Sequence, residues 1–235
     1  SNHFEAMANR DAAVEASGAL KTVAISLSNI ANNIRWLASG PRCGIGEITI
    51  PELQPGSSIM PGKVNPVIPE AVMMVGAQVV GNDATIAWAN ALGSNFDLNV
   101  QMPVLAYNLL QSIELLTSAA TVLGAKCVAG TAANAQRCAE SIERSLAMCT
   151  ALAPRIGYDA AAAVAKKAFQ TGQNVRDIAR ALAGTSPEEV AGLLGTPLSP
   201  DAMTQGVPSA AEIDRLLDPH GQTLRGVGAG GSAGG

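Results

Sequence analysis

The chain has 235 residues, of which 48% are hydrophobic and 3% aromatic, and a formal net charge of −4. Its length allows one large or two modest domains, and the excess of aliphatic over aromatic residues favours helix-on-helix packing over a β-sandwich. The negative charge argues against nucleic acid and membrane-surface binding, and no uninterrupted apolar run reaches the roughly 18 residues of a membrane span. We therefore expect an all-α protein that binds neither nucleic acid nor membrane.

The cysteines and histidines do not have the spacing of a metal site. There is no C-x-x-C pair, so we predict no metal site. Reduced thiols fit a cytoplasmic setting. The last three cysteines are 11 residues apart, about three helical turns, and would share one face of a continuous helix, as small buried apolar residues. The residues are Cys43, Cys127, Cys138, Cys149, His3 and His220.

The N-terminal third begins with a long helix. Apolar residues recur at helical spacings over residues 4–38, and Ser39-Gly40-Pro41 ends the pattern. Residues 42–55 are punctuated by Gly and Pro and predict a loop with a short extended piece. Because the chain starts with Ser1 rather than Met, we expect the natural N-terminus, and any targeting signal, to lie upstream.

Two further helices are predicted after Pro66, over residues 66–92 and 98–123, with Pro103 in the first turns of the second helix or at a kink. Both are apolar on nearly every side. Helices of this kind are usually buried all round, which in a protein of this size indicates partner helices from other subunits.

The remainder of the chain is built from shorter, more amphipathic helices. Ser186 is a good N-cap, followed by two acids in the first turn of a helix. We divide the chain into a bundle domain over residues 1–126, a small helical domain over 127–206 and a mostly flexible tail over 207–235. The short helices are predicted over 134–152, 158–170, 175–182 and 187–194, with a helix-like piece over 210–217.

The loop of residues 55–66 concentrates the polar chemistry. Two Pro-Gly pairs disfavour helix and strand, and Asn65-Pro66 looks like an N-cap followed by the first helical residue. Free amides and the helix dipole at such a start favour an anion. Ser57, Ser58 and Lys63, with Asn65 where its amide is not fully used as a cap, would hold a carboxylate. A structural glycine-rich connection explains the same pattern equally well.

Glu70 follows in the first turns of the helix. Its carboxylate could orient a partner base through a charged hydrogen bond, or could simply be a solvated acid.

The sequence Gly-Ser-Ser-Ile-Met-Pro-Gly-Lys-Val-Asn-Pro at residues 56–66 closely resembles the signature loop of the fumarase/aspartase superfamily. Further segments resemble class II fumarate hydratases, and the likeness covers roughly residues 3–206. It implies long helices of a central bundle plus a small C-terminal helical domain, in a homotetramer with each active site built from three subunits. No cofactor is implied. The further segments lie at residues 36–42, 46–48, 81–83, 96–100 and 156–159.

The resemblance also implies roles for the loop residues. Ser57 matches the serine that acts as catalytic base on the carbon-bound proton beside a carboxylate. Glu70 matches the glutamate that pairs with the catalytic histidine. Contacts to the carboxylates of a small dicarboxylate substrate are implied for Ser58, Lys63, Val64 and Asn65.

The expected reaction is the reversible hydration of fumarate to L-malate, a step of the tricarboxylic acid cycle. Pro61-Gly62-Lys63 and residues 95–100 look like fumarase, whereas Val67-Ile68-Pro69-Glu70 resembles aspartases, so aspartate ammonia-lyase is the alternative. The family's catalytic histidine belongs to an N-terminal half that has no match here. We therefore expect these 235 residues alone to be inactive, and a non-catalytic helical assembly scaffold is the alternative of a different class.

Overall fold

The computed structural model describes residues 2–224 and divides into two compact units, Ser1–Asn134 and Ala135–Gly235. The predicted division falls earlier, between residues 126 and 127. The short strand β4 (Ala132–Ala133) pairs antiparallel with β1 (Ile48–Thr49), and this pairing ties residues 127–134 to the first unit.

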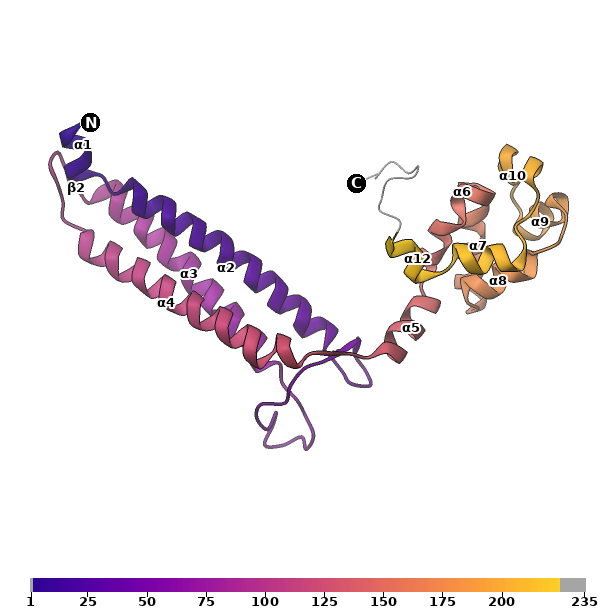
Figure 1. Ribbon diagram of the computed structural model, residues 1–235, viewed down its shortest axis with the longest axis horizontal. Coiled ribbons are helices and arrows are strands. Elements are labelled where there is room, and N and C mark those ends of the chain that lie inside the picture. Colours follow the sequence, from indigo (N-terminus) through magenta and orange to yellow (C-terminus); the bar gives the residue numbers. More distant parts are fainter. Residues whose placement is uncertain (1, 225–235) are drawn as a thin grey trace. The chain divides into compact units, whose positions relative to one another are not determined.

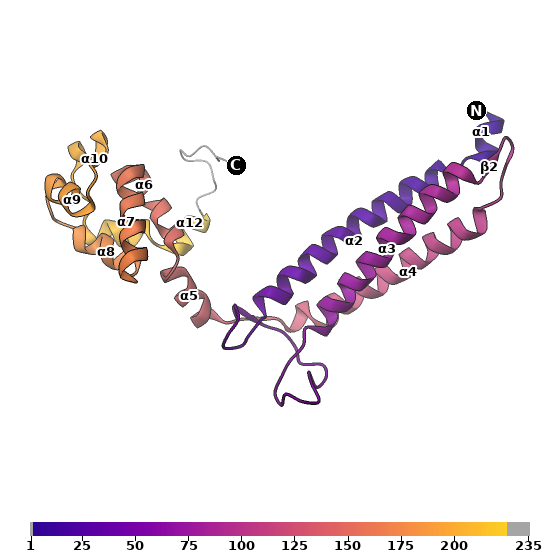
Figure 2. The same cartoon turned by 180° about the vertical axis from the view of Figure 1, so that it is seen from behind.

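The first unit is a bundle of three long helices that lie side by side (Figures 1 and 2): α2 (Asp11–Leu37), α3 (Val67–Leu92) and α4 (Met102–Lys126). Pro103 lies in the first turn of α4, where its missing N–H costs no helical hydrogen bond. The all-α prediction is confirmed. The minor elements of this unit are α1 (His3–Ala8), β2 (Ser94–Asn95) paired with β3 (Leu98–Asn99), and the 3-10 turn η1 (Val128–Gly130).

The prediction of one continuous helix over residues 4–38 is wrong at one point. The helix is interrupted between α1, which ends at Ala8, and α2, which begins at Asp11. The Arg10 N–H donates to the side-chain oxygen of Asn90 on α3 at 2.7 Å. The Arg10 guanidinium donates to the carbonyls of Ala6, Met7 and Asn9, at 3.4, 3.0 and 2.6 Å. These bonds satisfy groups that a continuous helix would have paired internally.

The start of α3 also differs from the prediction. Helical structure begins at Val67, one residue later than expected, and Asn65 does not cap it. The Asn65 side-chain amide donates instead to the carbonyl of Gly56 at 2.6 Å. A tertiary bond across the loop has replaced the local cap.

Polar groups link the helices inside the bundle. Lys21 of α2 forms an ion pair with Asp83 of α3, which also accepts a hydrogen bond from Ser17 at 2.8 Å. The buried Asn82 donates to Ser112 of α4 at 3.0 Å. Buried polar groups are costly unless paired, so these contacts favour one register of the three helices.

The bundle covers little of its own apolar surface. The interior consists of small and aliphatic side chains such as Ala24, Ala31, Val79 and Ile86. The segment 102–130, containing α4, is long and apolar enough to cross a membrane, but it carries the buried polar residues that bond to α3. Exposed large apolar side chains on the three helices include Val23, Ile25, Trp36, Met74, Trp88, Leu92, Tyr107 and Leu110.

The second unit packs short helices around a separate core (Figure 1). The predictions for residues 175–182 and 187–194 are confirmed, and Ser186 and Glu189 form a capping box. The elements are α5 (Ala135–Glu143), η2 (Leu146–Ala151), α6 (Ala153–Ile156), α7 (Tyr158–Thr171), α8 (Val175–Leu182), α9 (Pro187–Leu194), α10 (Pro200–Gln205), α11 (Ala210–Leu216) and α12 (Pro219–Leu224).

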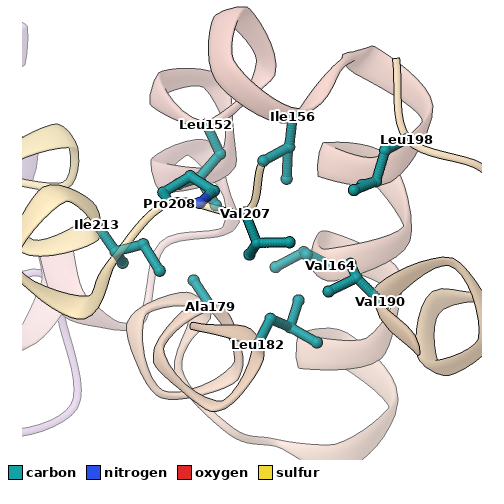
Figure 3. Close-up of a pocket in the computed structure, with 10 residues that line it drawn as sticks. All are labelled: Leu152, Ile156, Val164, Ala179, Leu182, Val190, Leu198, Val207, Pro208 and Ile213. Carbon is teal, nitrogen blue, oxygen red and sulfur yellow. The ribbon is translucent and has the colours of Figure 1, made fainter. Parts of the chain in front are cut away.

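A small cavity lies inside this second core (Figure 3). Its walls are apolar side chains, among them Leu152, Val164 and Leu182, and its volume is about 20 Å³. A cavity needs roughly 10–15 Å³ of such volume for one water molecule, and an apolar one stays dry. This space is a packing void rather than a substrate site.

The three cysteines predicted to share a helical face lie on different elements. Cys127 follows α4, Cys138 lies on α5 and Cys149 on η2. Cys127 and Cys149 are buried, as small apolar residues would be, and burial raises the pKa of Cys149 to about 11. Cys43 is exposed.

Residues 207–224, assigned to a tail from the sequence, form α11 and α12 in the structure. Ile213 and Leu217 of this segment are buried in the core of the second unit. The Arg176 guanidinium donates to the Leu217 carbonyl at 2.8 Å and thereby fixes the end of α11. The rest of the predicted tail, residues 225–235, lies outside the described residues.

If residues 207–224 belong to this core, Leu217→Ala should lower the free energy of unfolding by about 2–5 kcal/mol, as buried Leu-to-Ala changes do. Leu217 is 0% exposed, whereas Leu193 of α9 is 54% exposed and provides the matched control. Urea unfolding followed by circular dichroism measures both variants. Equal, small losses for the two would show that the segment does not contribute to the core.

Candidate active site

The signature loop extends beyond the end of the bundle where α2 ends and α3 begins (Figures 1 and 2). Its first part is a tight turn around Ser57. The Ser57 hydroxyl oxygen accepts hydrogen bonds from the backbone N–H groups of Ile59 and Met60, both at 3.1 Å. Two amide donors on one oxygen stabilise negative charge there, and the hydroxyl proton is left free to be donated.

The second part of the loop folds back on the first. A Cβ atom at Gly56 would stand 1.9 Å from the Lys63 carbonyl oxygen, so only glycine permits this approach. Gly62 has φ +79°, a left-handed conformation that favours glycine. The hydrogen bond from Asn65 to Gly56 closes the loop at its base. The two ends of the signature sequence are therefore in direct contact.

An open pocket of about 680 Å³ lies beside this loop. It brings together three of the predicted site residues: Lys63, Val64 and Glu70. Ser57, Ser58 and Asn65 are not among its lining residues; Ser57 and Asn65 are partly buried in the loop and Ser58 is exposed. The pocket is large enough for a small dicarboxylate and its water.

Residues distant in the sequence complete the pocket wall. Arg35 comes from the last turn of α2, Thr49 from β1, and Asn134 from the end of the first unit. The Asn134 side-chain amide donates to the Gly46 carbonyl at 3.1 Å and holds this wall against the loop that precedes β1. None of these three was predicted, although an arginine just before Ser39-Gly40-Pro41 could have been noticed.

The charges in the pocket are two cations and one carboxylate. Within the described residues 2–224, Arg35, Lys63 and Glu70 take part in no ion pair. The histidines, His3 and His220, do not line the pocket. In that same part of the chain, no group of three or more His, Cys, Asp or Glu side chains is placed to hold a metal ion. The two cations can bind a small anion and Glu70 supplies a carboxylate, while the Ser57 hydroxyl lies in the adjoining loop outside the pocket lining.

Comparison with known proteins identifies the family. A family model described as Lyase matches residues 1–81, and one described as Fumarase C C-terminus matches residues 148–205. The class II fumarate hydratase of Mycobacterium tuberculosis H37Rv is 54% identical over 175 residues, which are 74% of this chain and 37% of that protein. That of Neisseria meningitidis is 56% identical over 188 residues, 80% of this chain and 40% of the relative.

Among solved structures, the class II fumarase of Schistosoma mansoni superposes with a TM-score of 0.77 at 34% identity, over 93% of this chain and 41% of that one. The chain belongs to the fumarase/aspartase superfamily of lyases. The curated relatives named here are class II fumarate hydratases, and the chain spans about two fifths of their length.

Because Asn65 closes the loop, Asn65→Ala should loosen it. Losing one hydrogen bond of about 1 kcal/mol corresponds to roughly fivefold faster hydrogen exchange at the Ile59 and Met60 amides. Mass-spectrometric hydrogen exchange measures this. Asn33→Ala, on the exposed side of α2, is the control and should leave the loop unchanged. Unaltered exchange in Asn65→Ala would show that the Gly56 contact does not hold the loop.

Proposed function

We propose that this chain is the C-terminal portion of a class II fumarate hydratase that reversibly hydrates fumarate to L-malate in the cytoplasm. The observation that carries the proposal is the signature loop folded against a pocket lined by Lys63, Val64 and Glu70. Identities of 54–56% to proteins named class II fumarate hydratase support the same reaction. No cofactor is needed for it.

Ser57 is the catalytic base in this proposal. In the dehydration direction its alkoxide takes the proton from the malate carbon next to a carboxylate, and the hydroxyl on the neighbouring carbon leaves as water with a proton from a general acid. A free serine is a poor base, so its alkoxide must be stabilised. The Ile59 and Met60 amides, both 3.1 Å from the Ser57 oxygen, supply two such donors.

The substrate carboxylates are held by Ser58, Lys63, Val64 and Asn65. Removing the proton places extra negative charge on the adjacent carboxylate, so a cation there binds the transition state more strongly than the ground state. Lys63 is exposed at the pocket and takes part in no ion pair with residues 2–224. Its charge is therefore available to the substrate.

Glu70 acts on a histidine that this chain does not supply. We propose that the histidine belongs to the N-terminal half of the same enzyme, and that the complete protein, called here the parent lyase, is a homotetramer. Supporting this, the outer faces of the bundle expose large apolar side chains such as Met74, Trp88 and Leu110. Surfaces of this kind mark interfaces between subunits.

Aspartate ammonia-lyase is the alternative activity, favoured by Val67-Ile68-Pro69-Glu70 alone. Both reactions remove a proton beside a carboxylate and differ in the leaving group. Assays of the parent lyase with malate and with aspartate separate them. Turnover of malate supports the proposal, and turnover of aspartate without malate contradicts it.

Ser57→Ala in the parent lyase should lower kcat by a factor of at least about 10², since general-base catalysis contributes this much or more, and leave KM within about threefold. Steady-state malate dehydration, followed by fumarate absorbance, gives both constants. Ser94→Ala, an exposed serine in β2 at the opposite end of the bundle, is the matched control. A kcat equal to the unsubstituted value would exclude Ser57 as the base.

The 235-residue chain alone should show no measurable fumarate hydration and should regain it when the N-terminal half is supplied. The reason is that Ser57 and Glu70 lack the histidine partner. Activity assays with and without the added half, alongside light scattering for assembly, test this. Full activity of the isolated chain would show that the active site does not need the N-terminal half. Persistent inactivity of the assembled protein would favour a non-catalytic scaffold.

A further inference from the structure

Arg35 is the cation of the pocket to which the family resemblance gives no role. It lies in the last turn of α2 and lines the same pocket as Lys63. Its guanidinium contacts the sulfur of Met73 on α3 at 3.7 Å, and Met73 is one helical turn beyond Glu70. Arg35 therefore stands over the first turns of α3, on a different element from Lys63.

The charge of Arg35 is not compensated within the described chain. Its hydrogen-bond acceptors are the Asn32 side-chain oxygen at 3.4 Å and the Met73 sulfur, both neutral. Arginines of the second unit contrast with it, because Arg155, Arg176 and Arg180 bond to carboxylates at 2.7–3.4 Å. An exposed guanidinium beside a pocket, with only weak neutral contacts, is free to bind an anion.

We propose that Arg35 is a substrate-anchoring residue that binds the second carboxylate of the dicarboxylate, while Lys63 binds the first. This inference rests on the proposed function. A dicarboxylate carries one negative charge at each end, and Arg35 places a second cation in the pocket that Lys63 lines. Two cations from two elements, α2 and the signature loop, make the pocket selective for dicarboxylates over monocarboxylates.

Two other roles for Arg35 are simpler. A cation in the last turn of a helix interacts favourably with the helix dipole, and this would affect stability only. Arg35 could instead act through Glu70, which would change kcat rather than ligand selectivity. An experiment has to separate binding from both roles.

The test compares Arg35→Gln, Arg35→Lys and the unsubstituted parent lyase. Fumarate KM and kcat come from steady-state kinetics, and calorimetry gives dissociation constants for succinate and for propionate, which lacks the second carboxylate. We expect Arg35→Gln to raise the fumarate KM and the succinate dissociation constant about tenfold, the usual size for a charge-assisted hydrogen bond. Propionate binding should stay within twofold, and Arg35→Lys should recover part of the succinate affinity.

Arg215→Gln is the matched control, because Arg215 is an exposed arginine in the last turn of α11. It removes a helix-end cation without touching the pocket. Equal weakening of succinate and propionate, a fall in kcat at unchanged KM, or no change at all would each overturn the anchoring role. The unsubstituted protein's turnover of fumarate tests the proposed function separately, and the calorimetric comparison tests Arg35 whatever that result is.

Discussion

The hydrogen bond from Asn65 to the carbonyl of Gly56 is the contact on which the geometry of the site depends. It joins the two ends of the signature sequence and brings the Lys63 carbonyl so close to Gly56 that no side chain fits there. Because α3 begins at Val67, directly after this closure, Lys63 and Glu70 are fixed within a few residues of one helix start. The loop and the helix therefore position the site as one unit.

The sequence predicted helix bounds correctly where nearby residues alone determine them. Helices α8 and α9 have the predicted bounds, and Ser186 caps α9 as expected. The predictions failed where a long-range contact competed with a local one. The Arg10 N–H bonds to Asn90, 80 residues away, and no short window of sequence contains both partners of that contact. Asn65 bonds to Gly56 within the same loop instead of capping α3, a choice that residue preferences at helix starts do not reveal.

Only part of the site could be predicted, because some of its residues are brought together by the tertiary fold. The loop residues were found because they are contiguous, and the resemblance, rather than spacing, gave Ser57 its role. Arg35, Thr49 and Asn134 reach the pocket through the end of α2 and the pairing of β1 with β4, which depend on the tertiary fold. The apolar outer faces of the helices are exposed in a single chain, and their burial by helices of other subunits stays a prediction.

Two features of the single chain are related: its pocket is open, and its helical bundle exposes apolar side chains. Two cations and a carboxylate line the pocket beside the signature loop, but neither of the two histidines lines it. The bundle has interior polar pairs that fix its register, but exposes Met74, Trp88 and Leu110 to water. Burying such side chains contributes about 25 cal/mol per Å² of apolar surface toward association of chains. In the proposed parent lyase the same assembly that covers these faces would supply the histidine on which Glu70 is proposed to act.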